Sequence, residues 1–204
     1  DDTTWRVRYF SPESEVPFCG HATIALGAAL ASKAGPGTFR LQLNDAAISV
    51  EGAATGDLFT ATLQSPPTRS AVLTDDQTAD TLALFGYDIS QLNTEFAPAH
   101  IHGGADHRLL VLKDRTDLAA MSYDLDAGRD FMRDQGLVTI MLAWHAGGNR
   151  FDVRNAFASG GVLEDPATGA AAAAFSGYLR DTGWQTAGEI SIVQGEDMGS
   201  RSLI

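Results

Sequence analysis

The pattern of hydrophobic and polar positions predicts one helix and a group of strands in the first third of the chain. A run of small apolar residues predicts a buried helix over residues 22–33, which the GPG sequence at residues 35–37 ends. Apolar and polar residues alternate in four short segments, as they do in half-buried strands. These predicted strands comprise residues 5–10, 38–43, 47–51 and 58–63.

Strands and helices alternate along the rest of the chain. The TDDQ sequence at residues 74–77 is typical of a capped helix start, and an alanine run from Ala170 predicts a second small-residue helix. Shorter surface helices are expected over residues 117–121 and 127–135. Apolar segments predict buried strands over residues 109–112, 137–144 and 151–157. The sequence therefore predicts an α+β fold.

Loops of similar design precede the two small-residue helices. Residues 16–23 read VPFCGHAT and residues 162–169 read VLEDPATG. Sliding the sequence by 146 positions sets Val16 on Val162 without a gap, and it sets Cys19 on Asp165. A duplicated unit explains these matches. We therefore predict two halves, residues 1–98 and 99–204, that face each other and bring both loops to one cleft.

Strand-like segments stand at both ends of the sequence. Trp5 lies in an apparent strand almost at the first residue, and residues 202–204 read as a strand that has just begun. We expect the first half to lack its start and the second half its end. The missing C-terminal strand is expected to complete the first half.

Composition narrows the classes of function. The formal net charge is −12 and the 14 Lys and Arg residues are scattered, which argues against nucleic-acid binding. No apolar run reaches the roughly 20 residues that span a bilayer. One cysteine cannot form an internal disulfide, and a reducing compartment is the simplest setting for it. We expect a soluble cytoplasmic protein without a membrane segment.

The two loops carry the candidate chemistry. His21 is the best candidate for proton transfer, because an imidazole titrates near neutral pH. Asp165 is either an N-cap, with Pro166 at the first helical position, or a carboxylate that orients a histidine. Cys19 is either a thiolate whose pKa the helix start lowers or a packed small residue at the edge of the site. Four further residues are candidate donors of hydroxyl or backbone N–H groups to a substrate: Gly20, Thr23, Thr168 and Gly169.

Three histidines elsewhere in the chain have the spacing of a metal site. His100 and His102 are two residues apart, so a strand would turn both imidazoles to one face, and His107 follows closely. No clear acidic or thiol partner accompanies them. We therefore expect no bound metal.

Three motifs in order resemble the PhzF family of phenazine-biosynthesis-like proteins. They are residues 8–23, which include RYFSP and EVPFCGHAT, residues 161–169, which read GVLEDPATG, and residues 194–199, which read QGEDMG. The resemblance covers nearly the whole chain. It implies the diaminopimelate epimerase-like fold, with two pseudo-symmetric halves, each a curled, mostly antiparallel sheet around a central helix.

The resemblance also implies cofactor-free isomerase chemistry, in which carbon-bound protons move on a small carboxylated substrate. The family's motif histidine and aspartate fall on His21 and Asp165, and its motif glycines, Gly20 and Gly169, offer backbone N–H groups. Ala170 stands where the best-studied members have a serine. The other residues expected to bind substrate are Cys19, Thr23 and Thr168. A homodimer is expected by the same analogy.

In the family, the principal acid/base is a glutamate in an S-E-T-like segment upstream of the first motif. No such segment precedes Arg8 in the given sequence. We expect that carboxylate in an upstream segment, and neither Glu13 nor Glu15 takes the role. Two alternatives stay open. One is a catalytically silent protein that binds a small acid, and the other is a cysteine-based racemase, which would need a second thiol where the chain has Asp165.

Overall fold

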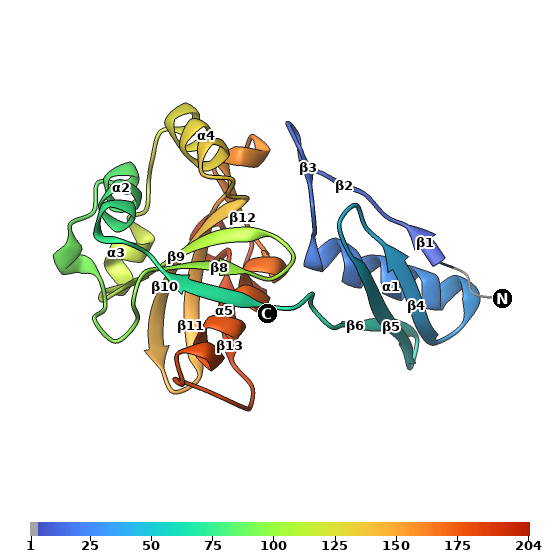
Figure 1. Ribbon diagram of the computed structural model, residues 1–204. Coiled ribbons are helices and arrows are strands. Elements are labelled where there is room, and N and C mark those ends of the chain that lie inside the picture. The colour runs from blue at the N-terminus through green and yellow to red at the C-terminus, as the bar shows by residue number, and fades with distance from the viewer. Residues whose placement is uncertain (1–3) are drawn as a thin grey trace.

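A single long helix packs on a four-stranded sheet in the N-terminal half of the molecule (Figure 1). The computed structural model describes residues 4–204. The helix is α1 (Gly20–Ala34), and the strand order β1-β4-β5-β6 uses β1 (Thr4–Arg6), β4 (Gly37–Gln42), β5 (Ala47–Thr55) and β6 (Leu58–Leu63). A Cβ atom on Gly27 of α1 would lie 2.5 Å from Val50 Cγ2 and 2.9 Å from Ala61 Cβ. The helix reaches its sheet this closely because its contact residues are small.

The C-terminal half is built on a larger sheet with helices on both faces (Figure 1). Its strands run in the order β14-β13-β11-β10-β9-β8-β7, and β12 pairs with β11. Their bounds are β7 (Arg69–Val72), β8 (Ala99–His102), β9 (Asp106–Leu112), β10 (Thr139–Gly147), β11 (Arg150–Ala156), β12 (Glu164–Asp165), β13 (Ser191–Gln194) and β14 (Ser202–Leu203). Most neighbouring strands are antiparallel, whereas β9–β10 and β11–β13 are parallel.

Alternation along β9 shows how the sheet separates two cores. Leu109 and Val111 pack with Phe175 of α5 (Gly169–Asp181) on one face. Leu110 and Leu112 pack on the opposite face, against α2 (Asp75–Phe85), α3 (Arg115–Ala119) and α4 (Leu125–Asp134). Because both faces are covered, β9 is an almost continuous apolar run. Three 3₁₀ turns complete this half: Ile89–Gln91, Ala158–Gly160 and Glu196–Met198.

Most of the expected elements form close to their predicted positions. Thr74 caps α2 as predicted, because its hydroxyl accepts from the Gln77 N–H while the Gln77 side chain accepts from the Thr74 N–H. The segment predicted as one opening strand, residues 5–10, is two strands in two sheets. Its second part, β2 (Tyr9–Phe10), forms a hairpin with β3 (Glu15–Val16). Arg8 favours this turn because its guanidinium pairs with Glu15.

The sheets divide earlier in the chain than the expected boundary between residues 98 and 99. Strand β6 ends the first sheet at Leu63, and β7 begins the second at Arg69. Strand β7 belongs to the second half because it pairs with β8, and α2 belongs there because Leu82 and Phe85 enter the second core. Residues 69–98 therefore extend the C-terminal half.

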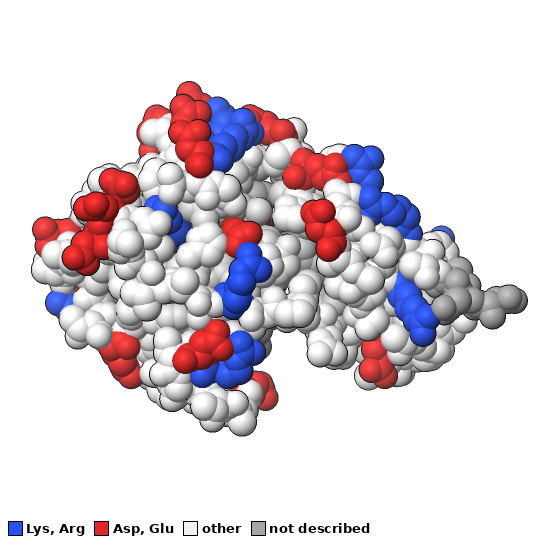
Figure 2. Space-filling view, in the orientation of Figure 1, with Lys and Arg blue, Asp and Glu red and all other residues white. Residues whose placement is uncertain are grey.

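Charged side chains of both signs are mixed on the surface drawn in Figure 2. On the face drawn in Figure 2, Lys and Arg lie next to Asp and Glu and form no continuous basic area. Within residues 4–204, no helix has both the length and the apolar character needed to cross a membrane.

Candidate active site

The two small-residue helices begin against each other. Helix α1 starts at Gly20 and α5 at Gly169, and a Cβ atom on Gly20 would lie 3.1 Å from the Gly169 Cα. The helix starts are three residues farther apart than the 146-residue offset predicts, so the equivalent N-caps are Cys19 and Thr168. Neither N-cap side chain bonds its helix. Both first turns therefore present backbone N–H groups and the positive ends of two helix dipoles to one place.

A cavity of about 390 Å³ lies at this junction. It is lined from the N-terminal half by the β2–β3 hairpin and the start of α1, and from the C-terminal half by β9, β10 and the start of α5. The residues predicted from sequence that line it are Cys19, Gly20, His21, Asp165, Thr168, Gly169 and Ala170. The predicted cleft between two polar loops is therefore present.

His21 reaches across from α1 to the opposite loop. Its Nδ1 lies 2.7 Å from the Ala167 carbonyl oxygen, so this nitrogen carries a proton and donates it. The Cys19 sulfur lies 3.7 Å from each ring nitrogen. Contact with Cys19, the Ala167 carbonyl and the charge of Asp165 outweigh partial burial and raise the pKa of His21 to about 9. His21 is accordingly an imidazolium at neutral pH and can give up a proton.

Asp165 is not the N-cap of α5. The residue lies in strand β12, opposite Asn155, and the helix begins four residues later. Its Oδ2 accepts a 2.6 Å hydrogen bond from the Thr168 hydroxyl, and its Oδ1 lies 3.5 Å from the Ala167 nitrogen. The loop bonds leave the carboxylate on the cavity wall. Asp165 therefore lines the site without capping the helix, and the Ala167 carbonyl rather than Asp165 accepts the hydrogen bond that orients His21.

Gln194 holds the Asp165 loop in place, although sequence reasoning gave it no role. Its side chain is almost fully buried at 1% exposure. Its Nε2 donates to the Asp165 carbonyl at 2.6 Å and to the Thr168 hydroxyl at 2.9 Å, and its Oε1 accepts from the Thr168 N–H at 3.1 Å. The QGEDMG motif that begins at Gln194 was the available signal. This motif therefore marks a residue that holds the Asp165 loop of the site in position.

Thr23 does not face the cavity, contrary to the expectation that its hydroxyl meets the substrate. The residue is fully buried, and its hydroxyl donates to the Cys19 carbonyl at 2.7 Å. Since that proton is used, the Tyr9 hydroxyl donates to the Thr23 oxygen at 2.5 Å. Thr23 thus ties the first turn of α1 to the β2–β3 hairpin and acts on the site through Cys19.

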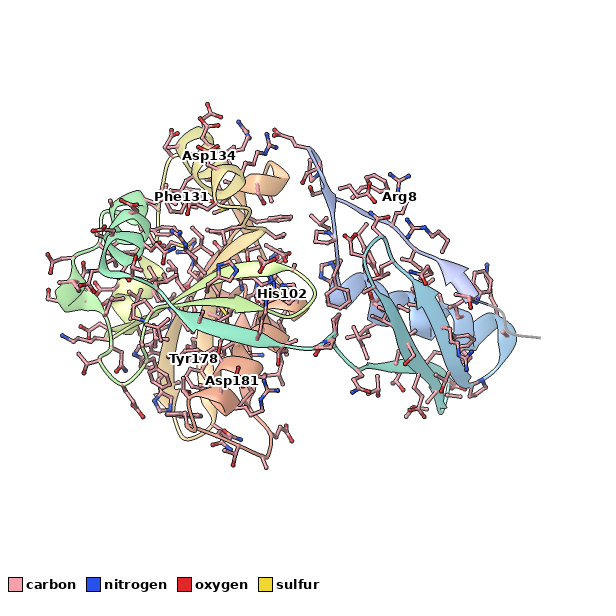
Figure 3. The ribbon with its side chains drawn as sticks, viewed as in Figure 1. Arg8, His102, Phe131, Asp134, Tyr178 and Asp181 are labelled. Carbon is pink, nitrogen blue, oxygen red and sulfur yellow. The ribbon has the colours of Figure 1, made fainter. Side chains whose placement is uncertain are left out.

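The three histidines separate into two environments. His100 and His102 on β8 both face the Asp106 carboxylate, at 2.7 and 3.1 Å. Figure 3 shows His102 near the β8–β9 turn, on the side that faces the N-terminal half. His107 instead is fully buried and lines the cavity together with Thr139. Within the described part of the chain, no three His, Cys, Asp or Glu side chains form a group suited to a metal ion.

The family comparison agrees with the motifs. A family model described as phenazine biosynthesis-like protein, PhzC-PhzF, matches residues 1–204. The chain belongs to this family. Among its curated relatives, an uncharacterized isomerase of Deinococcus radiodurans is 29% identical over 186 residues, which cover 89% of this chain and 60% of that protein. A trans-2,3-dihydro-3-hydroxyanthranilate isomerase of Pseudomonas fluorescens is 30% identical over 204 residues, which cover 97% of this chain and 68% of that protein.

Solved structures confirm the expected fold. A protein of Pseudomonas aeruginosa described as a predicted epimerase superposes with a TM-score of 0.83 at 23% identity, covering all of this chain and 71% of its own. A PhzF-family protein of Bacillus anthracis gives 0.77 at 15% identity, over 97% of this chain and 70% of its own. A probable proline racemase of Agrobacterium radiobacter gives 0.62 at 12% identity, over 93% of this chain and 59% of its own. The PhzF chain shares the diaminopimelate epimerase-like fold with these proteins.

The acidic residues nearest the first PhzF motif are engaged in ion pairs. Glu15 accepts from the Arg8 guanidinium at 2.7 and 3.0 Å, and Arg8 followed by Asn44 lowers the pKa of Glu15 to about 2. Glu13 pairs with Arg129 at 2.9 Å and with Arg133 at 3.1 Å. Glu15 thus ties the β2–β3 hairpin to Asn44, and Glu13 ties it to α4.

Proposed function

We propose that this PhzF-family protein is an isomerase that moves a carbon-bound proton on a small carboxylated metabolite. The observation that carries the proposal is the cavity in which His21 and Asp165 flank the paired helix starts at Gly20 and Gly169. The names of the curated relatives support it, because they are isomerases. The chain spans 60% of the length of the first of these relatives, so the activity belongs to the proposal.

The helix starts supply the group that binds the acid. The first turns of α1 and α5 contain no acidic residue, and neither N-cap side chain occupies their N–H groups. A carboxylate at this point receives backbone hydrogen bonds and two favourable dipoles. When a proton leaves the adjacent carbon, the same donors stabilise the negative charge that spreads onto the carboxylate oxygens.

His21 and Asp165 supply complementary proton chemistry. The raised pKa of His21 makes its imidazolium a proton donor at neutral pH. The Asp165 carboxylate, held by Thr168, is an acceptor on the same cavity wall. One carbon of the substrate loses its proton to a base, the double bond shifts, and a proton returns at another carbon. In the family that the chain resembles, the principal acid/base is a glutamate of an S-E-T-like segment.

Solvent exchange tests the proposal directly. The protein is incubated in D₂O with a panel of small acids that includes trans-2,3-dihydro-3-hydroxyanthranilate, and proton NMR follows the loss of carbon-bound protons. We expect His21→Gln and Asp165→Asn each to slow exchange by about 10² to 10⁴-fold while the protein stays folded. Asp57→Asn, at the exposed β5–β6 turn, controls for loss of a carboxylate.

The outcomes separate the isomerase from the catalytically silent acid-binding protein. Exchange at the wild-type rate in either folded variant contradicts the acid/base roles. Binding of an acid by the full-length wild-type protein with no exchange favours the alternative, a protein that keeps the fold and binds a small acid. The predicted homodimer is checked in the same samples by light scattering.

A further inference from the structure

A buried histidine on the cavity wall has an unused ring nitrogen. His107 is the second residue of β9, paired with Thr139 of β10, and its side chain has no exposed surface. Its Nδ1 lies 2.8 Å from the Thr139 hydroxyl oxygen. Its Nε2 finds no hydrogen-bond partner within residues 4–204. Buried polar atoms are almost always paired, so an unpaired one beside a cavity points to a missing ligand.

With the Asn155 amide as it is oriented in the structure, the neighbouring bonds assign the proton to one ring nitrogen of His107. The Thr139 hydroxyl donates to the Asn155 side-chain oxygen at 3.1 Å, which uses its only hydrogen. The Thr139 oxygen must therefore accept from His107, and Nδ1 is the protonated nitrogen. A neutral imidazole with a proton on Nδ1 has a lone pair on Nε2. His107 consequently presents an acceptor and no donor.

The surroundings keep the imidazole neutral. Burial lowers the pKa of His107 to about 3, even though the nearby Asp106 carboxylate favours the charged form. The nearby His102 and His100 also oppose a further positive charge. The Asn155 side-chain nitrogen, at the far end of the chain of bonds, is also unpaired, and the reverse amide orientation would reverse the direction of the bonds. That alternative makes Nε2 a donor, which the experiment distinguishes.

We propose that His107 Nε2 accepts a hydrogen bond from a hydroxyl or amino group of the acid bound in the cavity and so selects ligands that carry such a donor. The inference rests on the proposed function for the presence of an acid at the helix starts. His107 is then a specificity residue. The helix starts bind the carboxylate, and His107 on the opposite wall binds a second polar group of the same ligand. A simple fatty or aromatic acid leaves the Nε2 lone pair desolvated and unpaired.

Two substitutions separate the nitrogens of His107. His107→Asn keeps a side-chain amide near the Nδ1 position, beside Thr139, and removes the group at Nε2. His107→Gln places its amide near the Nε2 position, where its oxygen can accept. The first probe, 3-hydroxyanthranilate, carries both an amine and a hydroxyl. Anthranilate lacks the hydroxyl, 3-hydroxybenzoate lacks the amine, and benzoate lacks both. Calorimetry measures the dissociation constant of each probe for each protein.

We expect the wild-type protein to bind at least one donor-bearing probe about tenfold more tightly than benzoate. His107→Asn should reduce this ratio to near one, and His107→Gln should retain most of it. Comparing anthranilate with 3-hydroxybenzoate shows whether His107 binds the amine or the hydroxyl. A wild-type protein that does not discriminate among the probes, or a His107→Asn variant with the wild-type ratio, overturns the inference.

A measurement without substitution covers the case in which either variant fails to fold. In protein labelled with ¹⁵N-histidine, His107 should show a protonated Nδ1 and an unprotonated Nε2, and the favoured probe should shift the Nε2 signal. A protonated Nε2 overturns the inference. Deuterium exchange reports separately on the proposed function. If His107→Asn loses selectivity but no acid exchanges its protons, the result supports the role of His107 and contradicts the isomerase. If exchange occurs but His107→Asn keeps the wild-type selectivity, the result supports the isomerase and contradicts the role of His107.

Discussion

Gly20 and Gly169 meet backbone to backbone where α1 and α5 begin. A Cβ atom on Gly20 would lie 3.1 Å from the Gly169 Cα, and one on Gly169 would lie 3.3 Å from the Gly20 Cα. Since the facing atoms belong to the backbone, they cannot rotate away as a flexible side chain does. The two halves therefore share a contact that sets how far apart the helix starts lie.

Gly20→Ala should force these helix starts apart. We expect a loss of about 1–3 kcal/mol in the free energy of unfolding, as for other overpacked sites, and weaker binding of benzoate because the two sets of N–H groups diverge. Urea unfolding and calorimetry measure the two effects. Gly37→Ala is the matched control, because a Cβ atom there meets nothing within 4 Å. Equal unfolding midpoints for the two variants would show that the contact tolerates a methyl group.

Gln194→Met should loosen the loop that carries Asp165. Methionine has nearly the same length but leaves the Asp165 carbonyl and the Thr168 N–H without the partners that Gln194 provides. Each unpaired buried group costs about 1–3 kcal/mol, so both stability and deuterium exchange should fall. Gln64→Met, at an exposed position, controls for the change in residue type. Wild-type exchange in a folded Gln194→Met protein would show that the loop holds itself.

The elements of this fold could be predicted from local patterns, and their pairing could not. Strong local signals, such as the capping residue Thr74 and the apolar run of β9, place α2 and the central sheet almost where they form. The sheet to which a strand belongs depends on tertiary partners. Residues 69–72 are in none of the predicted strands but pair with β8, and this pairing moves the boundary between the halves.

The site shows the same division. The motif loops identified His21 and Asp165, and the cavity contains both. Sequence could not show that the Thr23 hydroxyl is bonded inside the protein, because Tyr9 reaches it only after the β2–β3 hairpin has folded against α1. His107 was noticed only for its spacing from two other histidines. Its position on the cavity wall depends on the register of β9 with β10, which places it beside Thr139.

The contribution of His21 to the stability of the folded protein should be lost as the pH rises. Its pKa is raised from 6.5 to about 9 in the folded protein, so folding favours the proton. The stabilisation is complete below pH 6.5 and disappears as the pH passes through 9. For this half-exposed group it amounts to about 1 kcal/mol after solvent screening.

Unfolding curves of the wild type and His21→Gln should therefore converge as the pH rises through that window. NMR titration of the His21 ring supplies the direct check. In Cys19→Ala its pKa should move back toward 6.5, because contact with Cys19 is the largest cause of the shift. An unchanged ring titration in Cys19→Ala would assign the shift to Ala167 and Asp165 instead.

His107 should act in the opposite direction, in acid. Burial lowers its pKa from 6.5 to about 3, so the folded protein excludes a proton that the unfolded chain binds. The penalty is absent above pH 6.5 and grows as the pH falls toward 3, by about 1.4 kcal/mol for each pH unit well inside that window.

Other groups titrate in the same range, so the informative quantity is the difference between the wild type and His107→Asn, which keeps the polar contact to Thr139 and does not titrate. The unfolding free energy of the wild type should fall more steeply with acid than that of His107→Asn. Parallel curves would mean that His107 takes up its proton in the folded protein, which would remove the neutral acceptor from the cavity wall.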